Sequence, residues 1–373
     1  MKRFPRLPAP SSPVHHVTRV TVLTVVRLAV LFSVVMFAAG CSNGDGSPAS
    51  STAAGDVRMA ERVGLTMGSS LKLGIPTTDP AAAEQAFDAV FAEFNRLDAL
   101  LSVWKPGSDV LRVNGAAGIE PTTVGDDTMA VLEIAKQISE WTEGTFDVTF
   151  GAMADIWKFD HDQDNRVPSR EEVDARRPLI DYRAIHLDPP GHTALLEKHG
   201  MKIHLGGIGK GYAVEKAVGI LRDRGFKDFL IQAGGDLYVG GMANGRPWRL
   251  GIADPRAPEK SFGTLDLSDG TFSTSGDYER TFIKDGVRYH HIIDPRTGYP
   301  ATGMRSVTIV TNRPVLADGL SKGVFILGPA RGMALVERLP DVEAILVTDK
   351  NEVLVSSGLK DKFRQTSPPT DGL

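Results

Sequence analysis

The sequence has a single cysteine among its 373 residues, at position 41. A lone cysteine excludes an internal disulfide framework and any zinc or iron–sulfur site built from several cysteines. The net charge is small, -4 at neutral pH, and no basic cluster stands out, so nothing favours nucleic acid as a partner. With 42% hydrophobic and 24% charged residues, the composition is that of a globular protein with one large domain or two smaller ones.

The surroundings of Cys41 predict export. A basic leader that includes Lys2, Arg3 and Arg27 precedes an apolar run at 28–39, which is too short to span a bilayer, and Gly40 and Cys41 follow. This order is typical of a secretory signal. Its end resembles a bacterial lipobox, in which the cysteine is lipidated and becomes the mature N-terminus. The alternatives are an uncleaved anchor, or an ordinary signal with a chance cysteine.

The chain therefore divides into four predicted segments. Residues 1–40 form a lipoprotein signal peptide, and 41–57 hold the lipidated cysteine and a flexible linker rich in glycine and serine. The folded domain is expected over 58–361, with a disordered tail at 362–373. We expect a lipid-anchored protein at a cell membrane, facing the periplasm or the cell exterior.

Hydrophobic periodicity in the folded part indicates an α+β protein. Apolar residues recur at helical spacing, and the predicted helices cover residues 80–101, 126–142, 211–224 and 316–327. Strands are predicted at 62–76, 228–233, 236–240, 247–252, 263–267, 281–293 (with a turn at 285–286), 305–311 and 343–348. Helices and antiparallel strands are mixed and do not alternate as βαβ units, so α+β is the better class.

Four clusters hold more glycine and polar side chains than packing requires: 205–212, 232–236, 274–300 and 317–323. The first is either a phosphate cradle at a helix start or a tight turn on the core. The second is either a ligand contact or a strand bend. In the third, His290 and His291 fall on opposite faces of a strand, so at most one points into a site. In the fourth, the bland alternative is a surface ion pair between Asp318 and Lys322.

An acidic stretch at 160–171 has the spacing of a calcium loop. Asp160, Asp162, Asp164 and Glu171 occupy positions 1, 3, 5 and 12, but Asn165 stands where glycine is usual. The alternative is an acidic surface loop before a helix that begins after Ser169. A Ca²⁺ ion at 160–171 is therefore one of two interpretations.

The four clusters, in this order, resemble the ApbE family of FAD:protein FMN transferases. Upstream strings match as well, namely Met67-Gly68-Ser69, Ser102-Val103-Trp104 and the segment 144–159. The resemblance runs from about residue 60 to 350. It implies a mixed, largely antiparallel α+β fold with flanking helices and an active site in a cleft between two subdomains. It also implies transfer of FMN from FAD to a threonine hydroxyl of an exported or membrane redox protein, with Mg²⁺ and release of AMP.

The resemblance assigns roles to individual residues. It implies His291 as general base or phosphate contact, with Asp294 orienting it or helping to hold the metal. Metal-binding oxygens would come from Asp318, Ser321 and the carbonyl of Gly207. The implied flavin-binding residues are Met67, Trp104, Thr145, Phe146, Asp147, His204, Lys210 and Ile293.

Three positions depart from the family pattern. Lys322 replaces a metal-binding threonine, His204 replaces an aspartate, and Trp104 replaces a tyrosine. A protonated lysine cannot bind magnesium, so Ser321 or water fills that position, or the ammonium partly substitutes for the charge of the metal. Two other functions remain open: an FAD diphosphatase that releases FMN and AMP, and a non-catalytic flavin-binding lipoprotein.

Overall fold

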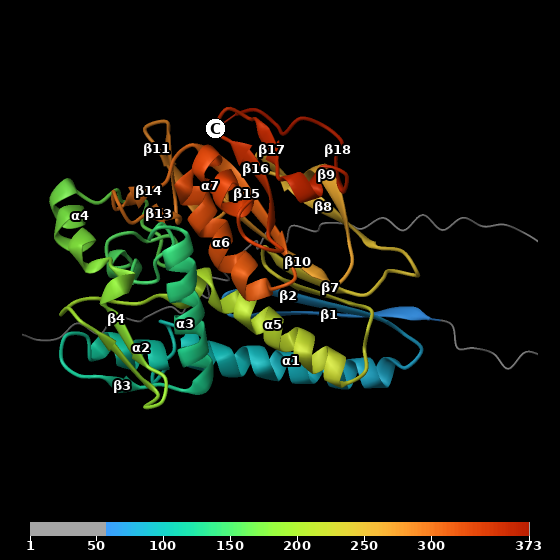
Figure 1. Cartoon of the computed structure of the whole chain (residues 1–373), viewed down its shortest axis with the longest axis horizontal. Helices are drawn as coiled ribbons and strands as arrows, with labels where there is room; N and C mark the ends of the chain where they lie inside the picture. Colours follow the sequence, from blue (N-terminus) through green and yellow to red (C-terminus); the bar gives the residue numbers. More distant parts are fainter. Residues whose placement is uncertain (1–56, 373) are drawn as a thin grey trace, which may run out of the picture.

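A computed structural model describes residues 57–372, and its centre is an eight-stranded sheet in the order β1-β2-β6-β7-β10-β15-β16-β17 (Figure 1). Every pairing in this sheet is antiparallel. Its strands are β1 Arg58–Thr66, β2 Ser69–Thr77, β6 Phe229–Ala233, β7 Asp236–Gly240, β10 Gly270–Gly276, β15 Met304–Thr311, β16 Glu343–Thr348 and β17 Val353–Val355. The predicted α+β class is confirmed.

Helices cover one face of the sheet, and several more lie beside it (Figure 1). They are α1 Pro80–Leu101, α2 Asp109–Gly115, α3 Asp126–Trp141, α4 Arg170–Arg176, α5 Gly209–Asp223, α6 Pro314–Leu327 and α7 Pro329–Val336. The start of α1 follows the sequence prediction, because the Asp79 side chain accepts a hydrogen bond from Ala82 N at 3.0 Å and proline takes the first helical position. Among the described residues, 57–372, no helix is long and apolar enough to cross a membrane.

The alternation of side chains along the central strands builds a core on each face of the sheet. In β15, Val307 and Ile309 pack against the helices, whereas Val310 packs on the opposite face. That opposite face is covered by a three-stranded sheet, made of β8 Trp248–Asp254, β9 Ala257–Leu267 and β18 Phe363–Gln365. The inner strands β15 and β16 of the central sheet are therefore buried on both sides, whereas the edge strand β1 is partly exposed.

The smaller strands form three further units. One is a three-stranded sheet of β3 Thr122–Thr123, β4 Ile185–Asp188 and β5 Thr193–Leu196. The others are the hairpin of β11 Thr281–Lys284 with β12 Val287–His290, and the short pair of β13 Ile293–Asp294 with β14 Tyr299–Pro300. The predicted turn at Asp285-Gly286 is confirmed, since both residues have positive φ.

Two sequence predictions are wrong. The single strand expected at 62–76 is two antiparallel strands, β1 and β2, joined by a turn in which Met67 and Gly68 have φ of 48° and 69°. The tail expected to be disordered at 362–373 is held on the domain as far as residue 372, because β18 pairs with β9 and Thr370 donates two hydrogen bonds to the buried Asp254. The predicted signal peptide, linker and Cys41 lie outside the described residues, apart from residue 57.

Candidate functional site

A cleft with two adjoining compartments lies where the sequence clusters meet. The first compartment has a volume of about 320 Å³ and the second about 430 Å³. The two share part of their walls, namely Gly68, Asp160, His204, Gly206, Lys210 and Arg280. A ligand that fills both compartments therefore lies beside Lys210 and Arg280.

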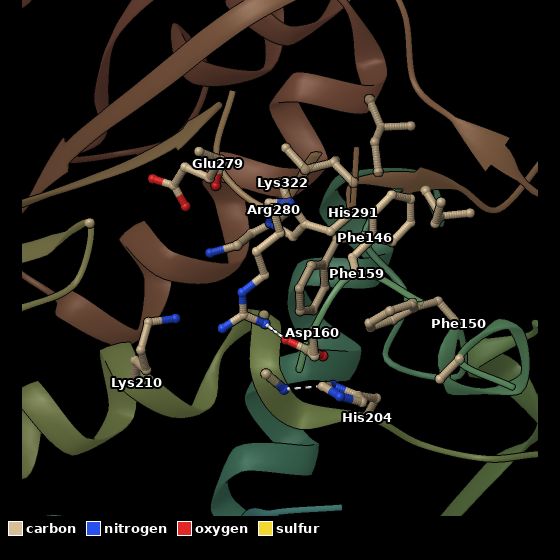
Figure 2. Close-up of a pocket in the computed structure, with 18 of the residues that line it drawn as sticks. Phe146, Phe150, Phe159, Asp160, His204, Lys210, Glu279, Arg280, His291 and Lys322 are labelled. Atoms are coloured by element: carbon tan, nitrogen blue, oxygen red, sulfur yellow. Dashed lines mark hydrogen bonds and ion pairs between the residues drawn. The ribbon is translucent and has the colours of Figure 1, made fainter. Parts of the chain in front are cut away.

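Aromatic side chains line one side of the first compartment, as Figure 2 shows for Phe146, Phe150 and Phe159. The ring of Phe150 packs against that of His204, with centroids 5.4 Å apart. Behind them, Trp157 stacks on Phe159 at 5.6 Å. Stacked rings of this kind accept a flat heterocycle.

Charged side chains occupy the other side of the same compartment (Figure 2). Lys210 stands in the first turn of α5 and lies 3.6 Å from Asp236, which begins β7. Burial alone would lower the pKa of Lys210, but Asp318 and Asp236 outweigh it and raise that pKa, so Lys210 is a cation at neutral pH. Arg280 pairs with Asp160 across the cleft. The compartment thus combines an apolar wall with three cations, Lys210, Arg280 and Lys322, which suits a ligand that joins rings to phosphates.

His291 faces the first compartment, as the sequence predicts for one of the two histidines. Its backbone N donates to Arg280 O at 3.1 Å, and its Nδ1 is buried with no hydrogen-bond partner. Burial, with Arg280 next, lowers the pKa of His291 well below its ordinary value, so the ring is neutral near pH 7 and can accept a proton. His290 is instead a buried structural residue that contacts Ala301 O at 2.9 Å.

Asp318 is fully buried and its oxygens already have donors. One carboxylate oxygen accepts from Gly211 N at 2.8 Å, and the other pairs with the Lys322 ammonium. Burial would raise the pKa of Asp318, but Lys322 and Lys210 outweigh it and lower that pKa. The ion pair is not an ordinary surface pair, because Asp318 is fully buried and only 18% of the Lys322 side chain is exposed.

These residues do not fit the magnesium site that the family resemblance implies. The Ser321 hydroxyl donates to Asp318 O at 2.8 Å and contacts Ser275 Oγ at 2.8 Å, so it is engaged within the protein. Gly207 lines the cavity, but magnesium needs about six oxygen ligands, and a lysine ammonium stands beside Asp318. Within 57–372, no group of three or more histidine, cysteine, aspartate or glutamate residues could hold a metal ion.

The role predicted for Asp294 is not supported. Its side chain does not line the cavity; it accepts from Arg296 N at 2.9 Å and forms an ion pair with the Arg296 guanidinium. Asp294 thus shapes the turn between β13 and β14, and the neighbouring Ile293 lines the compartment as predicted. The partner of the Asp294 carboxylate is Arg296, two positions further along the chain. A sequence motif alone does not show this pairing.

The flavin-binding residues expected upstream are divided between the compartments. Met67 and Trp104 line the second one, where Trp104 is 53% exposed and contacts the edge of His161 with centroids 4.6 Å apart. His204 lines both compartments, and its Nδ1 accepts from Gly206 N at 3.1 Å. His204 therefore holds the glycine loop before α5 in place. The histidine can do this although the family has an aspartate at this position.

Thr145, Phe146 and Asp147 line the first compartment, but two of them use their polar atoms inside the protein. The Thr145 hydroxyl lies 2.9 Å from Gly323 O. Asp147 accepts from Thr149 N and from Tyr182 N, each at 2.8 Å. Only the Phe146 ring is thus free to contact a ligand, while the other two residues hold the loop that carries it.

Asp147 predicts a pH-dependent stability. Burial raises its pKa to about 6, against the hydrogen bonds from Thr149. Because the folded-state pKa lies above the ordinary value, the stability that protonation contributes is fully present below about pH 4 and lost as the pH rises through about 6. We expect the free energy of unfolding of wild type, minus that of Asp147→Asn, to be about 2 kcal/mol larger at pH 4 than at pH 7. An unchanged difference would contradict the raised pKa.

In the described segment 160–171, the acidic side chains of the predicted calcium loop do not gather around one point. Asp160 pairs with Arg280, Asp164 accepts from Arg166 N at 2.9 Å, and Glu171 lies in the first turn of α4. Asn165 does adopt the left-handed conformation, with φ 56°. The segment is an acidic loop before a helix that Ser169 caps with a capping box.

Several lining residues were not predicted as site residues. They are Phe150, Met153, Trp157, Phe159, Asp160, Asp236, Thr274, Ser275, Glu279 and Arg280. Asp236, Glu279 and Arg280 belong to the polar clusters at 232–236 and 274–300. Membership of these clusters is the sequence feature that could have indicated them as site residues. The apolar residues of 150–159 belong to a segment that resembles the family, but they received no role in the site, because the same residue types line any core.

Comparisons with known proteins identify the family and the fold of this chain. The model of the ApbE family matches residues 67–346. The FAD:protein FMN transferase of Treponema pallidum is 32% identical, with 83% of this chain and 90% of that protein covered. The protein of the same name from Vibrio cholerae is 31% identical, over 82% and 94%. Crystal structures of the ApbE protein of Thermotoga maritima (TM-score 0.76, 32% identity, 82% and 99% covered) and of the flavin transferase ApbE from Vibrio cholerae (0.75, 27%, 82% and 100%) have similar folds.

Proposed function

The chain belongs to the ApbE family, and we propose that it is an FAD:protein FMN transferase, which moves FMN from FAD to a threonine hydroxyl of a target protein and releases AMP. One observation carries the proposal: two ring-lined compartments meet at a pair of cations, Lys210 and Arg280. FAD has two flat heterocycles joined through a diphosphate. The compartments suit the two heterocycles, and the cations suit the diphosphate between them.

The side chains of the cleft support phosphoryl transfer to a hydroxyl. The threonine Oγ attacks the phosphorus on the flavin side and forms a new P–O bond. The bond from this phosphorus to the bridging oxygen breaks, and AMP leaves with the electron pair. The hydroxyl proton passes to the neutral ring of His291, while Lys210 and Arg280 offset the charge on the phosphate oxygens. Magnesium has no step in this proposal, because the donors around Asp318 do not fit it.

The location of the target follows from the N-terminal sequence. We propose that a lipid on Cys41 holds the enzyme at the membrane surface, where exported or membrane redox proteins arrive after translocation. The basic leader, apolar run and Gly40-Cys41 support this. β1 begins at Arg58, shortly after the glycine- and serine-rich sequence at 42–56, a composition that is common between an anchor and a folded domain.

The test of the function uses the purified full-length chain, FAD and an FMN-accepting protein domain, with an acceptor whose threonine is replaced by alanine as the control. We expect in-gel flavin fluorescence on the acceptor, one AMP per flavin transferred, and no label on the alanine acceptor. AMP with free FMN and no labelled acceptor would replace the proposal by FAD hydrolysis. Flavin bound without either product would replace it by a carrier.

A further inference from the structure

The buried pair of Lys322 and Asp318 stands where the family resemblance places a metal. Both residues belong to α6, one turn apart, so their side chains share one helix face. Lys322 Nζ contacts a carboxylate oxygen of Asp318 and lies 2.8 Å from its backbone carbonyl. Lys322 lines the first compartment, whereas Asp318 lies behind it and is 0% exposed. A single ammonium thus contacts two oxygens of Asp318 at the wall of the cavity.

The stem of Lys322 passes beside the loop before α5. A Cβ at Gly207 would lie 4.0 Å from both Cδ and Cε of Lys322, an ordinary van der Waals distance. The remaining carboxylate oxygen of Asp318 accepts from Gly211 N, and its carbonyl also accepts from the Ser321 hydroxyl. Every oxygen of Asp318 therefore has an N–H or O–H donor, and a metal ion would have to displace the lysine to bind there.

The Lys322 ammonium supplies the positive charge that the buried Asp318 carboxylate needs. A fully buried carboxylate is strongly destabilising unless a positive charge accompanies it, and Lys322 supplies that charge. The same ammonium is a compact cation with three donors, a group that proteins use to bind phosphate oxygens. It lines the compartment that also holds Lys210 and His291.

We propose, on the basis of the function above, that the Lys322 ammonium takes the place of a divalent cation beside Asp318, so that this chain binds the FAD diphosphate with its own cation and without Mg²⁺ at Asp318. The step itself is unchanged: the same P–O bonds form and break, and the ammonium offsets charge on the phosphate oxygens. The disagreement between the metal site that the family implies and these residues is then a functional property of this chain.

Direct binding measurements test this inference without relying on turnover. Mn²⁺ is added to the full-length chain and followed by electron paramagnetic resonance, and FAD affinity is measured by flavin fluorescence in excess EDTA and in excess MgCl₂. For the wild type we expect no Mn²⁺ bound at Asp318 and an FAD affinity that differs by less than about twofold between the two conditions. Lys322→Thr is expected to bind one Mn²⁺ per chain, and its FAD affinity is expected to rise about tenfold or more with MgCl₂, roughly the strength of one charged contact.

Further variants keep the test decisive. Lys322→Met removes the charge without adding a ligand, so FAD binding is expected to weaken about tenfold in both conditions. Lys216→Thr is the matched control, a helical lysine paired with Asp127 at 2.9 Å that lines neither compartment, and it is expected to behave like wild type. One Mn²⁺ per wild-type chain that Asp318→Asn removes, or a tenfold MgCl₂ effect on wild-type FAD affinity, overturns the inference. A wild type that binds no FAD in either condition overturns the proposed function instead.

Discussion

Alanine in place of His291 is expected to abolish FMN transfer while FAD remains bound. The His291 ring is neutral and lines the first compartment, so the part of the ring that faces the cavity can take the proton of the incoming hydroxyl. General base catalysis contributes about a hundredfold to ten-thousandfold in rate, and we expect a loss in this range. FAD affinity should change by only a few fold, because the phosphates are held by Lys210, Arg280 and Lys322, which the substitution leaves in place.

Two further variants separate proton transfer from shape. His291→Gln keeps a polar side chain but cannot accept the proton, and it should be as inactive as the alanine variant. His290→Gln changes the neighbouring histidine, which is buried and contacts Ala301 O; it should lower stability by about 1 kcal/mol and leave transfer within a few fold. The rate of acceptor labelling and FAD affinity are measured for each. Wild-type labelling by either His291 variant would remove the role given to His291.

Much of the fold could be predicted because its signals are local. The apolar stripe of α1, its Asp79 cap and the turn at Asp285-Gly286 each depend on a few consecutive residues, and all three are confirmed. The strand at 62–76 was misread because Met67, a non-glycine residue, takes a left-handed conformation, which sequence patterns rarely indicate. The tail was misread because pairing of β18 with β9 is a contact between distant segments.

Only those residues of the site that lie in recognisable sequence motifs could be predicted. Lys210, His291 and Ile293 reach the cleft as expected, because each lies in a cluster of polar or glycine residues. Asp294 does not, since the partner of a carboxylate depends on geometry, and Arg296 is closer. The division of the cleft into two compartments could not be predicted from the sequence either. Trp104, Phe150 and Arg280 come from distant segments that only the fold brings together.

The packing of α5 on α6 depends on a glycine, and Gly211→Ala is expected to unfold this contact. An added Cβ would lie 2.4 Å from Pro314 O and 2.6 Å from Asp318 Cβ. The nearest atom belongs to the backbone, so the helices must separate, and the 2.8 Å hydrogen bond from Gly211 N to Asp318 is lost. Alanine gains about 1 kcal/mol in helix propensity, whereas overpacking costs about 1–3 kcal/mol and the loss of a hydrogen bond to a charged group about 1.5–3 kcal/mol. We expect a net loss of about 2 kcal/mol or more and no FAD binding.

A second glycine in the same helix supplies the matched control. Gly219 is exposed, and an added Cβ there meets nothing within 4 Å, so Gly219→Ala should gain stability by about 0.5–1 kcal/mol and bind FAD as wild type does. Urea unfolding measures the stability of the two variants, and flavin fluorescence measures their FAD binding. Opposite signs for one substitution in one helix show that the close approach at residue 211, and not helix propensity, sets the effect. Equal gains in both variants would mean that α5 and α6 tolerate a wider spacing, and that Asp318 does not need the Gly211 N–H to hold its place beside Lys322.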